Sequence, residues 1–152
     1  MIEVLNVFLL AMTPLGELRI ALPIALVVYG FSWFWAISVS VVGNMIPVIF
    51  LLLFLKPVSG WLSAKFNICQ SFFDWLFERT RRKSNHRMEK YGAIALVSFV
   101  AIPLPFTGAW TGSMIAFLFN IPFKKALPLI FLGVLMSGVI MLLLTQSSLW
   151  LI

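Results

Sequence analysis

The runs Thr13-Pro14-Leu15-Gly16 and Ile102-Pro103-Leu104-Pro105-Phe106-Thr107-Gly108 interrupt two apolar segments of this chain. Proline removes a backbone donor, and its ring clashes with a continuing helix. A membrane-spanning helix needs about 20 apolar residues. The apolar pieces on either side of the two runs are all shorter than that: 2–12, 17–29, 93–101 and 108–120. The sequence therefore predicts two broken helical segments instead of two more simple spans.

The composition indicates that the chain lies in a bilayer. Hydrophobic residues make up 62% of the 152 residues and charged residues 11%, whereas a soluble domain has roughly a quarter charged residues. Two segments, 33–55 and 124–146, are long enough to span. Irregular backbone is not tolerated against lipid, so we predict that 1–30 and 92–121 are re-entrant hairpins. The alternative is a pair of kinked spanning helices.

The basic residues predict the topology. Of the eleven Lys and Arg residues, eight lie between Lys56 and Lys90, while Lys124 and Lys125 form a second group and Arg19 stands alone. No nucleic-acid-binding motif accompanies this charge, and the positive-inside rule explains it. We expect a cytoplasmic 56–92 loop, external termini and hairpins inserted from opposite faces.

The two halves of the chain show a weak internal repeat. A shift of 90 positions places Ala36 on Ala126, Gly43 on Gly133, Tyr29 on Phe119 and Leu15 on Pro105. The order of a short helix, a break, a second short helix and a full span also occurs twice. We therefore predict an all-α integral membrane protein, a single domain over 1–152, built as an inverted repeat of the kind found in transporters.

The 57–90 connector has its own pattern. Its apolar residues recur at helical spacings among charged ones: Trp61, Ile68, Phe72, Trp75 and Leu76. This pattern predicts an amphipathic helix on the cytoplasmic surface; capping of a partner subunit is the alternative. The single cysteine, Cys69, and the single histidine, His86, suggest neither a disulfide nor a metal site. No nucleophile–base pair appears, so we expect no enzyme activity and no cofactor.

Glu17 and Arg19 are the only charged residues between positions 4 and 30, in the first apolar region. A charge in the bilayer centre costs at least roughly 2.5–3.5 kcal/mol, so such residues usually face a pathway or a partner. Two positions apart on a helix, they would not pair with each other. Thr13 before Pro14 is typical of a helix N-cap, and a second half-helix is expected to begin near Thr107.

Two such N-termini, with Arg19 between them, predict an anion site near the midplane. Glu17 is a candidate for proton exchange, because desolvation raises the pKa of a carboxyl while a nearby arginine lowers it. The alternative is that both residues lie at the hairpin mouth and fix its depth.

The second hairpin has no charge. Its Gly108-Ala109-Trp110-Thr111-Gly112 run is a GxxxG pattern, which allows close helix approach and favours a homodimer. Asn44 in the first span is expected to make an interhelical hydrogen bond. The hairpin-tip and cavity residues that we predict are Thr13, Pro14, Gly16, Pro23, Pro103, Pro105, Thr107, Gly108, Trp110, Thr111 and Gly112.

Three runs carry a resemblance to a known family: Gly16-Glu17-Leu18-Arg19-Ile20-Ala21-Leu22-Pro23, then Gly43-Asn44, then Phe99-Val100-Ala101-Ile102-Pro103-Leu104-Pro105-Phe106-Thr107-Gly108-Ala109-Trp110-Thr111-Gly112. The chain resembles the prokaryotic small multidrug export protein family, which is similar to the DedA superfamily. The resemblance implies two opposed re-entrant hairpins, two full spans and a prokaryotic cytoplasmic membrane. The name of the family implies drug export, whereas its similarity to the DedA superfamily implies lipid translocation.

Within that resemblance, the acidic residue of the first hairpin corresponds to Glu17. DedA members place arginines around the second hairpin's proline motif, whereas Ala101 to Gly112 has none here, so Arg19 would have to substitute. We expect a proton-coupled transporter or flippase for an amphipathic anion of the lipid phosphate class. The alternatives are a multidrug exporter for hydrophobic cations and a membrane organiser without transport.

Overall fold

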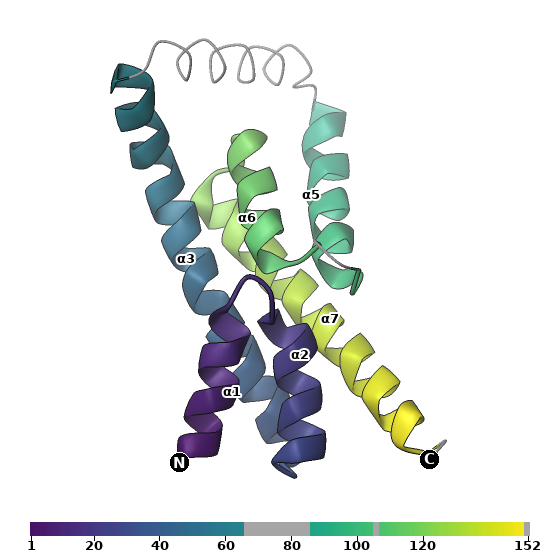
Figure 1. The fold of residues 1–152 in the computed structure, drawn as a ribbon. Helices are drawn as coiled ribbons and strands as arrows, with labels where there is room; N and C mark the ends of the chain where they lie inside the picture. The colour runs from purple at the N-terminus through teal and green to yellow at the C-terminus, as the bar shows by residue number, and fades with distance from the viewer. Residues whose placement is uncertain (66–85, 105–106, 151–152) are drawn as a thin grey trace.

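The computed structural model describes residues 1–65, 86–104 and 107–150, which form helices joined by turns and contain no strand (Figure 1). A π-helical turn, η1 (Ile24–Val28), continues α2. The helices in chain order are α1 (Ile2–Met12), α2 (Glu17–Pro23), α3 (Trp33–Lys65), α5 (His86–Ala101), α6 (Ala109–Leu118) and α7 (Phe123–Trp150).

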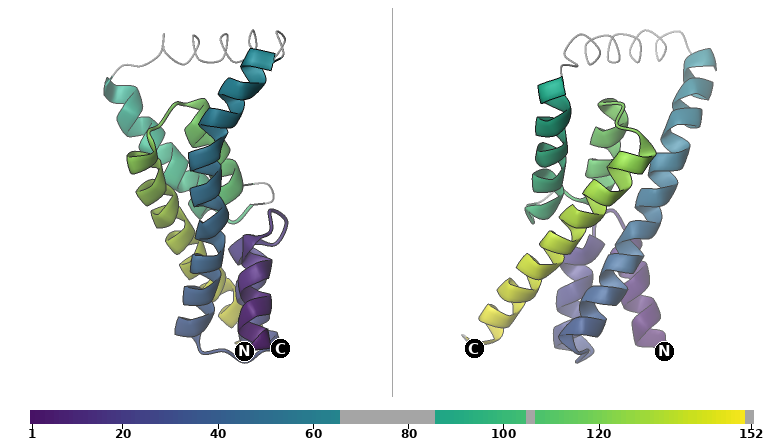
Figure 2. Two further views of the ribbon diagram at one scale, coloured as in Figure 1. Left: turned by 90° about the vertical axis from the view of Figure 1, so that its left-hand side faces the viewer. Right: turned by 180° about the vertical axis from the view of Figure 1, so that it is seen from behind.

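Two long apolar helices, α3 and α7, form the frame of the molecule. Trp33–Val58 and Phe123–Ser148 are each 26 residues long, with mean hydropathies of 2.3 and 2.6, which is enough to cross a membrane. The two helices contact each other and cross at an angle (Figures 1 and 2). The prediction of two long apolar helices is confirmed.

The ends of the predicted connector differ from expectation. Helix α3 passes through Pro57 and reaches Lys65, and α5 already begins at His86. Residues 57–65 and 86–90 therefore belong to α3 and α5, because continuing each helix keeps most backbone groups paired. Residues 66–85, which carry most of the predicted amphipathic pattern, lie outside the described residues.

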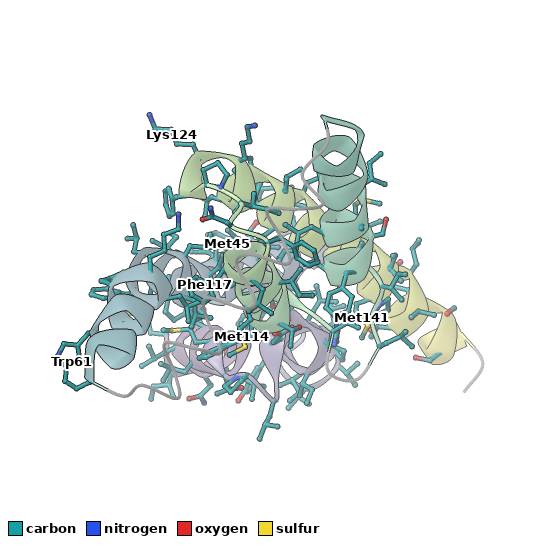
Figure 3. All side chains as sticks on the ribbon, turned by 90° about the horizontal axis from the view of Figure 1, so that it is seen from above. Met45, Trp61, Met114, Phe117, Lys124 and Met141 are labelled. Carbon is teal, nitrogen blue, oxygen red and sulfur yellow. The ribbon has the colours of Figure 1, made fainter. Side chains whose placement is uncertain are left out.

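Two short helix pairs pack against the long helices: α1 against α3, α5 against α7, and α2 and α6 against both. In the first pair the chain reverses between α1 and α2, and in the second it reverses between α5 and α6. The two reversals face each other at mid-height, while both termini lie at the same end of the molecule (Figures 1 and 2). Seen from above, α6 lies in the middle, with Met45 and Phe117 near the centre and Trp61 and Lys124 at the periphery (Figure 3).

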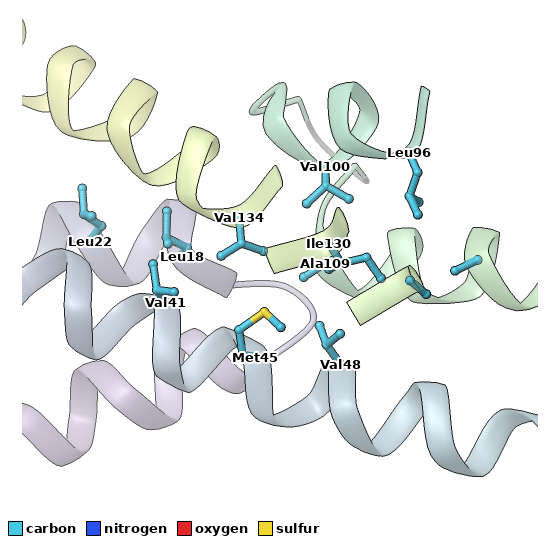
Figure 4. Close-up of a cluster of buried hydrophobic side chains, with 12 residues drawn as sticks. Leu18, Leu22, Val41, Met45, Val48, Leu96, Val100, Ala109, Ile130 and Val134 are labelled. Carbon is cyan, nitrogen blue, oxygen red and sulfur yellow. The ribbon is translucent and has the colours of Figure 1, made fainter. Parts of the chain in front are cut away.

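The main core joins α2, α3, α5, α6 and α7 where the pairs meet. Leu18 of α2, Val48 of α3 and Ala109 of α6 are at most 1% exposed and belong to one cluster (Figure 4). Helices α5 and α7 contribute Leu96, Val100, Ile130 and Val134 to the same cluster. A second cluster holds α1 and α2 against α3. Apolar burial thus fixes the two reversals next to each other.

Glycines allow each long helix to approach the first helix of its own pair. A Cβ atom on Gly43 of α3 would lie 2.7 Å from the Phe8 carbonyl oxygen of α1. A Cβ atom on Gly133 of α7 would lie 2.7 Å from the Cβ atom of Val100 in α5. These glycines are the pair that the 90-residue shift superimposes, and they make equivalent contacts.

Candidate functional site

Glu17 crosses from the first helix pair to the second. Its side chain is 7% exposed, and its Oε1 atom accepts a hydrogen bond of 3.2 Å from the backbone N–H of Trp110. Trp110 lies in the first turn of α6, where backbone N–H groups lack helical partners and attract negative charge. The carboxylate therefore caps a helix that begins 92 residues later in the chain.

Gly108, the residue before α6, makes room for this carboxylate. A Cβ atom there would lie 2.0 Å from Oε2 of Glu17, and the backbone φ of Gly108 is 148°. Glu17 itself has a φ of 45°, in the left-handed region that disfavours side chains. Glu17 therefore adopts an unfavourable backbone conformation at the position where its carboxylate contacts the start of α6.

Arg19 binds the other side of the same break. Its guanidinium donates hydrogen bonds to the carbonyl oxygens of Leu104 and Ile102 and to the hydroxyl of Thr107; the Nη2 distances are 3.3 Å to Ile102 and 2.8 Å to Thr107. Because α5 ends at Ala101, these carbonyls stand at its C-terminus, where cations are stabilised. The Nε atom of Arg19 is buried without a hydrogen-bond partner among the described residues.

Trp110 makes the reciprocal contact to the first helix pair. Its Nε1 atom donates a hydrogen bond of 3.2 Å to the carbonyl oxygen of Met12, the last residue of α1. Arg19 of α2 thus caps the end of α5, and Trp110 of α6 caps the end of α1. Each helix pair thus contributes a side chain that binds backbone groups of the other pair. We call Glu17, Arg19, Thr107, Gly108 and Trp110 the central junction.

Thr13 makes the hydrogen bond predicted for an N-cap, but it caps the turn that precedes α2 and also ends α1. Its Oγ1 atom donates to the Leu10 carbonyl at 2.8 Å and accepts from the Gly16 N–H at 3.0 Å, so Thr13 ends α1. Helix α2 starts only at Glu17, after an exposed turn that contains Pro14. The three intervening residues form the reversal, which Thr13 caps, and α2 continues from there only at the left-handed Glu17.

The GxxxG pattern serves two different contacts inside the chain. Gly108 packs on Glu17, whereas a Cβ atom on Gly112 would lie 2.5 Å from Cγ2 of Val100 in α5. Both glycines are buried. The predicted close packing is therefore found within the chain, and these two glycines offer no surface to a second copy.

The remaining predicted residues lie at varied distances from the junction. Thr111 donates to the Gly108 carbonyl at 3.3 Å, and Pro23 marks the change from α2 to η1. Pro103 is half-buried in the reversal after α5, whereas Pro105 lies outside the described residues. Asn44 is 2% exposed on α3, and its Oδ1 atom has no hydrogen-bond partner in the described part of the chain.

Sequence reasoning missed the partners of Glu17 and Arg19. The carbonyls of Ile102 and Leu104 and the N–H of Trp110 are backbone groups, which every residue type carries alike. The sequence contained only an indirect signal. The break at 102–108 leaves backbone N–H and C=O groups without helical partners, and the other broken segment carries one acidic and one basic residue, Glu17 and Arg19. Among the described residues, no group of three or more His, Cys, Asp or Glu side chains could hold a metal ion.

Comparison with known proteins identifies one family. A family model described as "Putative small multi-drug export protein" matches residues 17–140, which include the central junction, α3 and most of α7. No curated protein and no solved structure matches the chain.

Proposed function

Because this chain belongs to the small multi-drug export protein family, we propose that it is a membrane transporter with its translocation site at the central junction. The proposed substrate is an amphipathic anion of the lipid phosphate class, moved in exchange for or together with a proton. One observation carries the proposal: Glu17 and Arg19, both from α2, bind the break between α5 and α6 deep among apolar helices. Ionisable groups at such depth usually belong to a substrate or ion pathway.

The aromatic ends of α3 support a midplane position for the junction. Trp35 and Trp61 are exposed, and tryptophan favours the membrane–water interfaces. Their separation corresponds to about 39 Å along a helix, close to the roughly 40–45 Å of a bilayer with its headgroups. Val48 stands midway between them and shares a core cluster with Ala109 at the start of α6.

The charges at the junction support an anionic substrate. With Glu17 ionised, its carboxylate already satisfies the N-terminus of α6. Protonation of Glu17 would remove that negative charge and leave Arg19 with the positive end of α6, a combination that attracts an anion. An anionic headgroup would then replace the carboxylate on the same N–H groups, which couples a proton to the anion.

We further propose that both helix pairs are re-entrant and related as an inverted repeat. The reciprocal caps of Arg19 and Trp110 and the equivalent contacts of Gly43 and Gly133 support this relation. Helix α3 ends and α7 begins on the side of the molecule away from both termini (Figure 1). Lys56 lies in the last third of α3, and Lys124 and Lys125 lie in the first turn of α7, so we call this the lysine-rich end. By the positive-inside rule that end is cytoplasmic and the termini are external.

Liposomes containing the purified protein test the proposal. We expect faster flipping of a fluorescent phosphatidic acid than of the matching phosphatidylcholine, measured by dithionite bleaching under an imposed pH gradient. Glu17→Gln and Arg19→Ala should abolish the difference, while Glu3→Gln, at an exposed carboxyl far from the junction, should keep it. Wild-type flipping rates in both junction variants would reject the site.

Export of hydrophobic cations is a second candidate, which the description of the family favours. An ionised Glu17 would then hold the substrate's charge, and Arg19 would serve only to fix the second reversal. This candidate predicts that a cationic dye is transported in a Glu17-dependent manner and that Arg19→Lys keeps transport. Efflux of a cationic dye and of the fluorescent lipid phosphate, compared in the same vesicles, separates the two candidates.

A further inference from the structure

A groove runs along α3 from the central junction toward the lysine-rich end of the molecule. It has a volume of about 430 Å³ and is lined by Met12, Trp110 and six residues of α3: Pro47, Phe50, Leu51, Phe54, Leu55 and Val58. Gly43, Pro47, Phe50, Phe54 and Val58 recur at spacings of three and four, so they share one face of α3. Helix α1 covers this face at Gly43 and ends at Met12, which leaves the face beyond it open.

The dimensions of the groove match one leaflet of a bilayer. The stretch from Pro47 to Val58 corresponds to about 16 Å of helix, and half of the hydrocarbon core is about 15 Å. The inner end is Trp110, whose backbone N–H binds Glu17. At its outer end stands Val58, three residues before the interfacial Trp61.

The lining and the volume decide which occupant fits. All eight lining residues are apolar or aromatic, so the groove offers no match for a polar chain. A helix about 10 Å across and as long as the groove would occupy on the order of 1,200 Å³, roughly three times the space. A single hydrocarbon chain is narrow enough, and it needs only apolar contact.

We propose that this groove binds one hydrocarbon chain of the transported amphipath while the headgroup moves to the central junction. The inference rests on the proposed function and deepens it by naming a substrate with at least one long, narrow apolar chain. The hydrocarbon chain lies along α3, and its inner end contacts Trp110 of α6 and Met12 of α1. A lipid would therefore enter laterally, from the leaflet at the lysine-rich end.

Spin-labelled phosphatidic acid, with the label near the end of an acyl chain, provides the probe. Electron paramagnetic resonance of the protein in liposomes should show a motionally restricted component. Leu51→Trp fills the groove, and Val58→Trp narrows its outer end at a side chain that is already 51% exposed. Each should lower the restricted component at least twofold and slow flipping. Leu53→Trp, on an exposed residue of the same helix outside the groove, should change neither.

Other outcomes would overturn the inference. Equal effects of all three tryptophans would mean that the label senses only the surrounding lipid. Groove variants that lose the restricted component but flip phosphatidic acid at the wild-type rate would remove the groove from the transport path, with the proposed function intact. Disulfide crosslinking of Val58→Cys between two chains, in a Cys69→Ser background, would show that a second copy fills the groove.

The failure of the proposed function would look different. The proposed function would be refuted if the wild-type protein did not flip the lipid phosphate. The restricted component could still be lost in Leu51→Trp and Val58→Trp and kept in Leu53→Trp. In that case the hydrocarbon-chain site itself would stand.

Discussion

Glu17 and Arg19 bind opposite ends of one helix break: Glu17 accepts from the Trp110 N–H in the first turn of α6, and Arg19 donates to the carbonyls that follow α5. The broken helix thus presents its positive end to an anion and its negative end to a cation. Both charges come from α2, two residues apart. The break between α5 and α6 is stabilised from outside its own helix pair.

The left-handed backbone of Glu17 leads to a prediction about two substitutions. Both Glu17→Ala and Glu17→Gly remove the carboxylate, but only glycine adopts a φ of 45° without steric cost. The left-handed conformation costs a residue with a Cβ atom roughly 1–2 kcal/mol. We expect Glu17→Gly to be more stable than Glu17→Ala by about 1 kcal/mol, measured by denaturant unfolding in detergent micelles. An alanine variant as stable as the glycine variant would contradict the backbone strain.

A second prediction concerns Gly108 and its contact with Glu17. Gly108→Ala places a methyl group against the carboxylate and onto a φ of 148°, so we expect destabilisation of roughly 1–3 kcal/mol. Gly92→Ala is the matched control, because nothing lies within 4 Å of its Cβ position in α5, and alanine should stabilise that helix by about 0.5–1 kcal/mol.

The double variant Glu17→Ala/Gly108→Ala isolates the contact. Removing the carboxylate removes the clash. In a double-mutant cycle, the double variant should therefore lose less unfolding free energy than the sum of the two single variants. Simple additivity would show that the destabilisation of Gly108→Ala comes from its backbone conformation alone.

The sequence predicted the fold where backbone chemistry depends on residue type. Proline and glycine at 13–16 and 102–108 mark both reversals, and uninterrupted apolar length marks α3 and α7. A Thr before proline fits both the start of one helix and the end of another, and Thr13 makes both kinds of hydrogen bond. The sequence did not show that α2 itself starts only at Glu17.

The central junction was predictable only in part. An ionised pair in an apolar segment demands partners, so Glu17 and Arg19 could be selected from the sequence. Their partners are mostly backbone groups of Ile102, Leu104 and Trp110, and these groups are chemically the same in every residue. Which of them lie near α2 depends on the packing of Leu18 and Ala109 in the core, which is a tertiary property.

Arg19 should be sensitive even to lysine. Its two terminal nitrogens reach Leu104, Ile102 and Thr107 together, and a lysine ammonium cannot reproduce this planar fork. A hydrogen bond to a charged group contributes about 1.5–3 kcal/mol. We expect Arg19→Lys to lose about 1–2 kcal/mol of unfolding free energy and Arg19→Ala more.

Hydrogen exchange locates that loss. In Arg19→Lys the amides of Leu104 and Thr107, which hydrogen-bond within the reversal, should exchange faster than in the wild type. Amides of α1, such as that of Val7, should be unchanged. Uniform acceleration in both regions would indicate global destabilisation instead of a loosened reversal.

Gly43 and Gly133 give the last prediction, which tests the relation between the two halves. Each glycine brings a long helix against the first helix of its own pair, and in each case an added Cβ atom would lie 2.7 Å from its nearest neighbour. Because the neighbours are a backbone carbonyl of α1 and the Cβ atom of Val100, neither can move away as a flexible side chain would. We expect Gly43→Ala and Gly133→Ala to destabilise the protein by similar amounts, roughly 1–3 kcal/mol each. The two sites share no neighbour, so the double variant should lose nearly the sum of both, measured by thermal unfolding in detergent against the Gly92→Ala control. A large loss at one glycine with none at the other would show that the two halves pack by different rules and that their likeness is limited to sequence order.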